Sequence, residues 1–380
     1  MFNCMKIREF SVERWMDRYE TTCRYNLAET CVESLTVAEL LRLAGRNGGL
    51  QDELGPLKLT YGSIPGSDRL RAQIASLYAR QTPANVLVTH GAIGANSLVY
   101  QALVEPGDRV ISVLPTYQQH HSIPESLQAE VRTLRLREEN GFLPDLDELR
   151  RLVDGRARLI AFSNPNNPTG SLMDRTMLEG IVRIASEAGA WILSDEVYRG
   201  IDQEGEGFTA SVADLYDRGV STGSMSKVWS LAGLRLGWMV APAELLHSAT
   251  THRDYNTISV GMLDDWFAAM ALEARAAILA RSRSIVRDNL AVLDRWVAAE
   301  PSISYVRPRG GTTAMLKYAG TEPSESFCVR LVETTGVMFT PGSAMDMEGY
   351  VRIGYANNRA VLQEGLAQVT KFLARVAVTA

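Results

Sequence analysis

The sequence contains few of the residues that build metal sites and disulfide frameworks. Among its 380 residues are 4 cysteines and 5 histidines. The cysteines lack CxxC spacing and histidine neighbours, and the pair His120–His121 lies outside any HExxH motif. This pattern predicts no metal site and reduced thiols at every cysteine position, namely Cys4, Cys23, Cys31 and Cys328.

Long apolar runs and an excess of one charge are also missing. No run approaches the ~18–20 residues of a membrane-spanning helix. The start, MFNCMKIREFSVERW, has scattered charges and no apolar core of a secretory signal. The formal net charge of −5 gives no reason to expect nucleic acid or an anionic membrane as a partner. We therefore expect a cytoplasmic protein that acts on small molecules.

The length predicts two domains, because 380 residues exceed one compact core. From about residue 85, short apolar runs alternate with amphipathic segments. This alternation predicts βαβ units and a mainly parallel sheet. The expected strands cover 86–90, 109–115, 158–164 and 190–198, and the expected helices cover 91–104, 143–153 and 173–189.

After residue 260 the pattern changes. Residues 261–300 are almost continuously helical in pattern, and short strands and helices alternate from there to the closing helix expected over 358–376. We expect a large domain over 46–259 and a small α+β domain over 260–380. The N-terminal segment 1–45 has helix-like pieces without a strong strand, and we expect it to pack with the small domain.

Polar residues follow several of the expected strands, where doubly wound sheets bind their ligands. Gly91-Ala92-Ile93-Gly94 opens a helix and offers backbone N–H groups to a phosphate, although such a turn can also serve tight packing alone. Tyr117 follows the next strand. In SNPNNPTG (163–170), prolines and asparagines form a rigid turn that holds Asn167.

Asp195 lies in the apolar strand 190–198, where a carboxylate costs free energy unless it has a partner. Tyr198 follows it. In STGSMSKVWSLAGLRLGW (221–238), a single lysine, Lys227, is surrounded by serines and glycine and followed by Arg235.

These groups match the needs of pyridoxal 5′-phosphate (PLP). Its aldehyde needs a lysine, its pyridine nitrogen a buried aspartate, and its phosphate N–H groups, hydroxyls and an arginine. On this interpretation Arg235 also lowers the pKa of Lys227 by like-charge repulsion.

The motifs NPNNPTG, SDEVYRG, SMSKVWSLAGLRLGW and YVRIGYA, in this order and spacing, resemble the class I/II aminotransferases of the aspartate aminotransferase fold, fold type I of the PLP enzymes. The resemblance covers roughly residues 55 to 375. It implies an α/β protein in which a mainly parallel sheet is sandwiched by helices, with a smaller α+β domain.

The resemblance also implies roles for single residues. Lys227 forms the internal aldimine and moves the proton, Asp195 pairs with the pyridinium, and Tyr117 stacks on the ring. Tyr198 and Asn167 bind the 3-oxygen of the cofactor. The phosphate is held by the N–H groups of Ala92 and Ile93, with Ser224 and Arg235.

Further implied roles concern the substrate and a second subunit. Arg352 in VRIG binds the substrate α-carboxylate as a bidentate fork, beside Asn167. Tyr61 in LTYGSIPG matches a tyrosine that reaches the phosphate of the neighbouring subunit. This match implies a homodimer with shared active sites.

The N-terminal segment departs from the family. Many members carry a glycine-containing segment that closes over the substrate carboxylate, whereas here NLAETCVESLT (26–36) places Glu29 there. The N-terminal stretch WMDRY…NLAET…SLTVAEL also resembles the capreomycidine synthase branch, which cyclises a hydroxylated arginine on PLP. If this resemblance extends to the substrate, Glu29 faces a cationic side chain such as guanidinium. The alternative is that Glu29 is a solvated or dipole-capping residue. Trp15 and Tyr19 are further candidates for the side-chain pocket.

Two kinds of reaction therefore stay open. The first is an aminotransferase that moves the amino group of an amino acid to a 2-oxo acid through a lysine-bound aldimine. The alternative is a cyclase or eliminase, a decarboxylase or an oxidase that acts on an amino acid such as an arginine derivative.

Two other classes are disfavoured. A PLP-binding regulator needs a DNA-binding module, for which we find no signal. The SxxK match at Ser224–Lys227 lacks the SDN and KTG motifs of β-lactamases.

Overall fold

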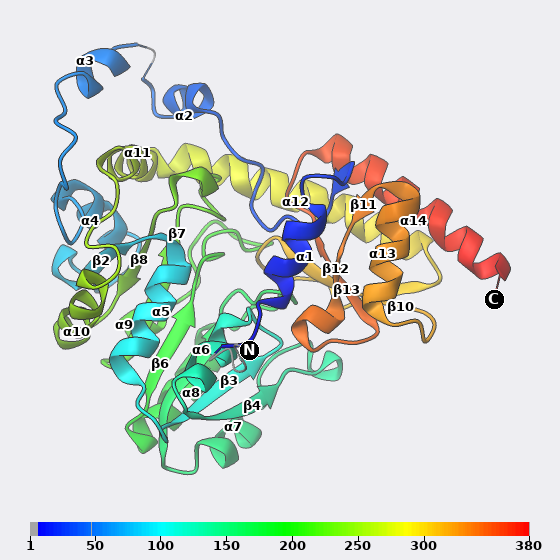
Figure 1. Cartoon of the computed structure of the whole chain (residues 1–380), viewed down its shortest axis with the longest axis horizontal. Helices are drawn as coiled ribbons and strands as arrows, with labels where there is room; N and C mark the ends of the chain where they lie inside the picture. Colours follow the sequence, from blue (N-terminus) through cyan, green and yellow to red (C-terminus); the bar gives the residue numbers. More distant parts are fainter. Residues whose placement is uncertain (1–6, 47, 380) are drawn as a thin grey trace, which may run out of the picture.

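The computed structural model describes residues 7–46 and 48–379, with side chains up to residue 375. Cys4 lies outside these residues, whereas Cys23, Cys31 and Cys328 are free thiols. The larger part of the molecule contains a seven-stranded sheet with the strand order β2-β8-β7-β6-β5-β3-β4 (Figure 1). Neighbouring strands are parallel except for β8, which is antiparallel to β2 and β7. The strands are β2 (Val86–Thr89), β3 (Arg109–Leu114), β4 (Glu130–Arg135), β5 (Ala157–Ser163), β6 (Trp191–Asp195), β7 (Gly219–Ser224) and β8 (Gly237–Val240).

Helices cover both faces of this sheet, which is why strands such as β3 and β6 are buried along their whole length, whereas the edge strand β4 is mostly not buried. In β5, Leu159 packs in a core cluster with residues of α5 (Gly91–Leu103) and α10 (Ala243–Asp254) on one face of the sheet. The next residue, Ile160, packs in the opposite cluster with α7 (Leu146–Val153) and α8 (Arg175–Ala188). This two-layered core confirms the predicted α/β fold class.

The smaller part contains an antiparallel sheet of four strands in the order β12-β13-β10-β9. Three helices pack with it: α12 (Arg275–Ala299), α13 (Ser324–Thr335) and α14 (Arg359–Thr379) (Figure 1). The helical stretch predicted over 261–300 is divided, because α11 (Met262–Glu273) ends before α12 begins and contacts α4 (Asp68–Ala75). The strands are β9 (Ile303–Tyr305), β10 (Thr313–Tyr318), β12 (Thr340–Pro341) and β13 (Tyr350–Gly354).

The N-terminal segment contacts both parts. It contains α1 (Ser11–Tyr19), α2 (Val37–Leu43) and a strand that the sequence pattern did not indicate, β1 (Tyr25–Asn26), which pairs with β11 (Val337–Met338). The Trp15 indole donates to the Phe339 carbonyl in the smaller part. On the other side, the Ser11 N–H donates to the Gln118 side chain, at 2.8 Å. Domain boundaries at residues 45 and 259 stay a prediction.

The remaining short helices connect these elements. In the part of the chain that the structure describes, no helix is long and apolar enough to cross a bilayer. The short α-helices are α3 (Leu50–Leu54), α6 (Gln119–Ser126) and α9 (Val212–Leu215), and the 3-10 turns are η1 (Pro83–Asn85), η2 (Glu138–Asn140), η3 (Ala232–Leu234) and η4 (Gly342–Met345).

Candidate active site

A cavity of about 450 Å³ lies at the carboxyl edge of the large sheet. The strand register explains its position, because Ser163 at the end of β5 pairs with Asp195 at the end of β6, and Asp195 pairs with Thr222 in β7. The loops that follow these strands therefore meet at one place. Eleven of the predicted site residues line this cavity: Glu29, Ala92, Ile93, Tyr117, Asn167, Asp195, Tyr198, Ser224, Lys227, Arg235 and Arg352.

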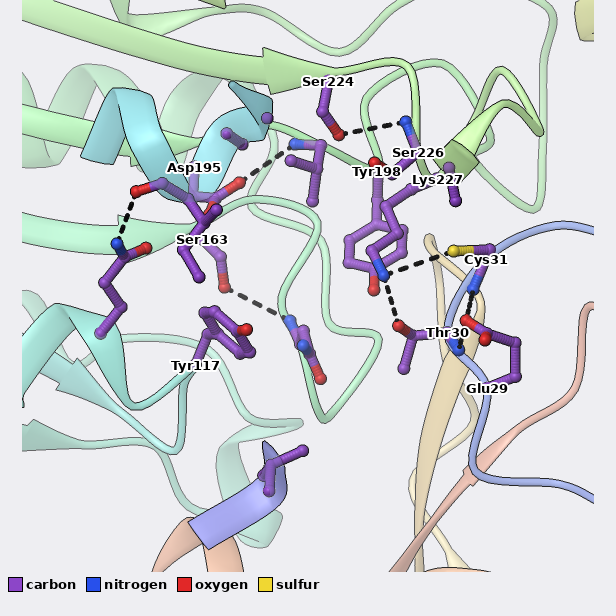
Figure 2. A pocket seen from close by; sticks show the side chains of 18 of the residues that line it. Glu29, Thr30, Cys31, Tyr117, Ser163, Asp195, Tyr198, Ser224, Ser226 and Lys227 are labelled. Carbon is purple, nitrogen blue, oxygen red and sulfur yellow. Dashed lines mark hydrogen bonds between the residues drawn. The ribbon is translucent and has the colours of Figure 1, made fainter. Parts of the chain in front are cut away.

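Lys227 points into the cavity toward the N-terminal segment (Figure 2). Its Nζ donates to Thr30 Oγ1 at 2.6 Å and to Cys31 Sγ at 3.5 Å. Burial disfavours the ammonium form, but attraction to the groups around it, Cys31, Tyr198 and Glu29 among them, outweighs burial and raises the pKa of Lys227.

The predicted lowering of this pKa by Arg235 is therefore wrong in direction. Arg235 is exposed, and its Nη1 donates to the Ala232 carbonyl at 3.1 Å. Solvent screens an exposed charge, whereas the groups that act on the buried Lys227 amine lie directly against it.

Asp195 is buried at the end of β6 and held by neighbours that sequence reasoning missed. Its Oδ2 accepts from Asn96 Nδ2 at 2.9 Å, and its Oδ1 accepts from the Val197 N–H at 3.3 Å. His120 Nε2 lies 3.5 Å from the same Oδ2. Asn96 is in turn fixed by the Thr222 hydroxyl, at 2.7 Å. No local motif marks these partners, since the contacts join separate elements.

Two buried side chains in the cavity carry polar atoms without partners. The Tyr198 hydroxyl has no hydrogen-bond partner among the described residues, although the side chain is 1% exposed. Arg352 is 2% exposed, and its Nε is likewise unpaired. Since buried polar atoms in native proteins nearly always have partners, these two indicate a ligand in the cavity.

Arg352 is held by contacts through its other nitrogens. Its Nη1 donates to Asn167 Oδ1 at 3.1 Å, and its Nη2 donates to Thr340 Oγ1 at 3.1 Å and to the Ala28 carbonyl at 3.3 Å. The guanidinium is therefore positioned by β12, by the turn after β5 and by the N-terminal segment.

The beginning of α5 has the features of an anion site. Gly91 opens the helix with a φ of 68°, and a Cβ at this position would lie 3.6 Å from Arg235 Nη2. The guanidinium thus lies beside the helix N-terminus, where the dipole favours a negative charge. A Cβ at Gly237 would lie 2.3 Å from the Gly91 carbonyl carbon, so β8 requires glycine there. Ser224 and Ser226 line the same end of the cavity.

Helix α1 presents one face to the cavity, and this face differs from the prediction. Trp15 and Tyr19, expected in the side-chain pocket, are not among the lining residues and pack in the core instead. Their stripe at i and i+4 is the apolar one, so burial against the smaller part orients the helix. The face toward the cavity carries Val12, Glu13 and Met16, and Glu20, the residue after the helix, also lines the cavity.

Glu13 and Glu29 add carboxylates that contact neighbouring groups. The Tyr117 hydroxyl donates to Glu13 Oε1 at 2.6 Å, and burial together with Glu13 raises the pKa of Tyr117. Glu29 Oε1 accepts from the N–H groups of Thr30 and Cys31. Burial opposes its charge, but Lys227 and these donors outweigh burial and lower the pKa of Glu29. Glu29 thus lines the cavity and also accepts the N–H groups of a turn, and its role toward a cationic side chain stays a prediction.

Tyr61, the predicted cofactor-binding tyrosine, also lies outside the cavity. It is 72% exposed and lies with Gly62, Met262 and Trp266 around a second, smaller depression. The Ser259 hydroxyl donates to the Tyr61 carbonyl, so the segments around these two residues lie together. Both segments expose further large apolar side chains, namely Leu59, Ile64, Tyr255 and Ile258.

Comparison with known proteins places this architecture in a family. Residues 49–369 match the model of aminotransferase class I and II. The chain is 32% identical to capreomycidine synthase of Streptomyces vinaceus over 95% of this chain and 93% of that protein. It is 28% identical to the aspartate/prephenate aminotransferase of Thermus thermophilus over 84% of each chain.

Solved structures agree. A PLP-dependent aminotransferase from Streptococcus suis superimposes with a TM-score of 0.94 at 44% identity, covering 98% of this chain and 99% of that one. The PLP-dependent cyclase OrfR superimposes with a TM-score of 0.90 at 26% identity and the same coverage. The chain therefore belongs to the aminotransferase class I and II family and is a PLP-dependent enzyme. The lysine, the buried aspartate and the unpaired Tyr198 hydroxyl fit this cofactor.

Proposed function

We propose that the protein is an aminotransferase that moves the amino group of an amino acid to a 2-oxo acid, with Lys227 as the residue that bears PLP. The observation that carries this proposal is the convergence of Lys227, Asp195 and Arg352 in one cavity. An amine, a buried carboxylate and a buried guanidinium supply an attachment point, a partner for the pyridine nitrogen and a site for an α-carboxylate.

The cofactor, when bound, supplies an electron sink that stabilises negative charge at the substrate α-carbon. The chain's own residues hold it. Asp195, fixed by Asn96, would be the partner of the ring nitrogen. Tyr198 and Asn167 would hold the ring oxygen, and Tyr117 would lie against the ring. The N–H groups of Ala92 and Ile93 would bind the phosphate, together with Ser224 and Arg235.

The substrate is oriented by Arg352. Its planar fork matches a carboxylate, and its fixed contacts to Asn167 and Thr340 lower the entropy lost on binding. The Lys227 amine lies in the same cavity and takes or returns the α-proton. Thr30 Oγ1, within 2.6 Å of Nζ, holds the amine in position while it does so.

The direct test is an assay for amino transfer. The holoenzyme is incubated with single amino acids and 2-oxoglutarate, and glutamate is measured. Glutamate at a steady rate with at least one amino acid supports the proposal. Cofactor-dependent consumption of an amino acid without glutamate or another new amino acid contradicts it.

One alternative is favoured by a specific observation. Two of the similar proteins, capreomycidine synthase and the cyclase OrfR, have names that state or imply other reactions than amino transfer, and the similarity spans nearly the whole chain. A cyclase or eliminase that acts on an amino acid such as an arginine derivative would use the same Lys227, Asp195 and Arg352. Mass analysis of the amino-acid product in the same assay separates the two, because elimination or cyclisation leaves the nitrogen on the substrate or releases it as ammonia.

We also propose a homodimer with shared active sites. Tyr61 is 72% exposed although it matches a cofactor-binding tyrosine of the family, which is expected if its ligand lies in a second subunit. Light scattering of the holoenzyme is expected to give twice the chain mass. Tyr61→Ala should lower PLP affinity, whereas the exposed Tyr255→Ala should not if Tyr61 alone reaches the phosphate. The cytoplasmic location stays a prediction.

A further inference from the structure

We propose that helix α5 couples the two ends of the bound cofactor, with Asn96 and Gln119 as positioning residues. These two side chains join the helix turn that receives the phosphate to the carboxylate that receives the ring nitrogen. The inference rests on the proposed placement of the cofactor. It goes beyond that placement, because it makes binding at one end depend on binding at the other.

Helix α5 carries parts of both sites. Its first turn contains Ala92 and Ile93, whose N–H groups are proposed to bind the phosphate. About one turn further along the same helix, Asn96 is 1% exposed and donates to Asp195 Oδ2 at 2.9 Å. A regular helix is a rigid element over such a short distance. A displacement of the first turn therefore also displaces the Asn96 amide relative to Asp195.

Gln119 forms a second connection between the same two places. It begins α6, is 4% exposed, and donates through Nε2 to the Ile93 carbonyl at 2.6 Å. Its Oε1 accepts from Asn96 Nδ2 at 3.2 Å. One buried amide thus contacts the backbone of the first turn of α5 and also the residue that holds Asp195.

Both donors and the oxygen of the Asn96 amide are in use. The N–H groups go to Asp195 and Gln119, and the oxygen accepts from the Thr222 hydroxyl at 2.7 Å. Turning the amide over would place its oxygen against the Asp195 carboxylate and lose these bonds. Asn96 therefore has one favoured orientation and transmits a displacement instead of absorbing it by rotation.

Among the described residues, Asn96 forms the shortest hydrogen bond to the Asp195 carboxylate. The Val197 N–H lies at 3.3 Å and His120 Nε2 at 3.5 Å, compared with 2.9 Å for the Asn96 amide. Since hydrogen bonds weaken as they lengthen, the Asn96 amide contributes most to the position of this carboxylate. A small movement of the amide therefore changes how well Asp195 meets the ring nitrogen.

Binding at the two ends is then linked through free energy. A phosphate that immobilises the first turn of α5 also restricts Asn96, so the ring nitrogen meets a carboxylate that has less freedom left to lose. Linkage is reciprocal, so the ring nitrogen must strengthen binding of the phosphate by the same factor.

The test measures four dissociation constants on the PLP-free full chain by equilibrium dialysis. The ligands are PLP, pyridoxal without the phosphate, and the 1-deaza analogue of each, in which C–H replaces the ring nitrogen. The gain from the nitrogen is the affinity of a ligand divided by that of its deaza analogue. The coupling factor is the gain with the phosphate divided by the gain without it, and we expect about fivefold or more. Intrinsic differences between the two ring types cancel in this quotient.

Asn96→Leu and Gln119→Met each remove an amide at similar side-chain size, and each should bring the coupling factor within about twofold of one. A uniform loss of affinity cancels in this factor, so a merely structural defect would not change it. Gln101→Leu is the matched control, because Gln101 lies exposed on the same helix with its side chain bonded to Ser97. It should keep the factor of the unaltered chain. Gln119→Met keeps the test decisive if Asn96→Leu does not fold.

The outcomes distinguish this inference from the proposed function. A coupling factor of one in the unaltered chain, or an unchanged factor in Gln119→Met, overturns the inference while the aminotransferase proposal stands. Asp195→Ala tests the placement of the cofactor separately, because it should abolish the gain from the ring nitrogen. A gain that persists in Asp195→Ala would contradict the role of Asp195 in the proposed function.

Discussion

The two walls of the cavity come from different regions of the molecule. One wall consists of loops that follow parallel strands and carries Asp195, Asn167 and Lys227. The other wall consists of α1 and the segment after β1 and carries three glutamates. On the proposed function, the first wall holds the cofactor, and the second lies opposite it, joined to it by the contacts of Lys227 with Thr30 and of Tyr117 with Glu13. We therefore expect substitutions in the first wall to affect the chemistry most.

The largest effect is expected from Lys227→Ala, which removes the attachment point in the first wall. The ~410–430 nm absorbance expected of lysine-bound PLP should vanish, and activity should fall by roughly 10³-fold or more, as loss of a general base warrants. Lys317→Ala is the control, since that lysine lies outside the cavity and pairs with Glu138. A retained band would mean that another lysine bears the cofactor.

Arg352→Lys should have the next largest effect, about 10²-fold on kcat/KM, because lysine cannot form the bidentate contact. The absorbance of the bound cofactor should stay normal, since the substitution leaves the first wall intact. Steady-state kinetics and a cofactor titration together check this. Equal kcat/KM in the variant would show that the α-carboxylate binds elsewhere.

The raised pKa of Lys227 predicts a pH dependence of cofactor loading. Only the neutral amine attacks the aldehyde, and below the pKa its fraction rises about tenfold for each pH unit. Loading of the PLP-free protein should therefore accelerate steadily between about pH 7 and pH 9. Stopped-flow absorbance measures the rate, and a pH-independent rate would contradict the raised pKa.

The smallest effect is expected from Tyr117→Phe, which removes the hydrogen bond from the Tyr117 hydroxyl to Glu13 in the other wall. The aromatic ring stays, so cofactor affinity should fall by only about threefold to tenfold. Glu13→Gln should lower it less than Tyr117→Phe, because the amide oxygen still accepts from the hydroxyl. A loss of more than about 100-fold in Tyr117→Phe would show that the hydroxyl contacts the cofactor directly.

The sequence predicts local features of each wall but not the contacts between residues that are far apart in the chain. The first wall was predictable, because turn residues, an apolar strand and a lone lysine are local signals that can be recognised in the sequence without knowledge of the fold. The partners of these residues were not predictable: Asn96 is separated from Asp195 by 99 positions and Thr30 from Lys227 by 197.

In the second wall, the sequence likewise did not predict which face of α1 lines the cavity. Trp15 and Tyr19, predicted to line the side-chain pocket, lie on the buried stripe of α1 instead. Which stripe faces the cavity depends on where the smaller part packs, here through the Trp15 indole and the Phe339 carbonyl.

By itself the sequence determined the family, the cofactor and the α/β fold class, because these depend on local chemistry and on motif spacing. Only the tertiary structure decided that Glu13, Glu20 and Glu29 line one cavity and that the pKa of Lys227 is raised rather than lowered. The physical reason is that burial and charge act through space, over distances that the chain bridges only when it is folded.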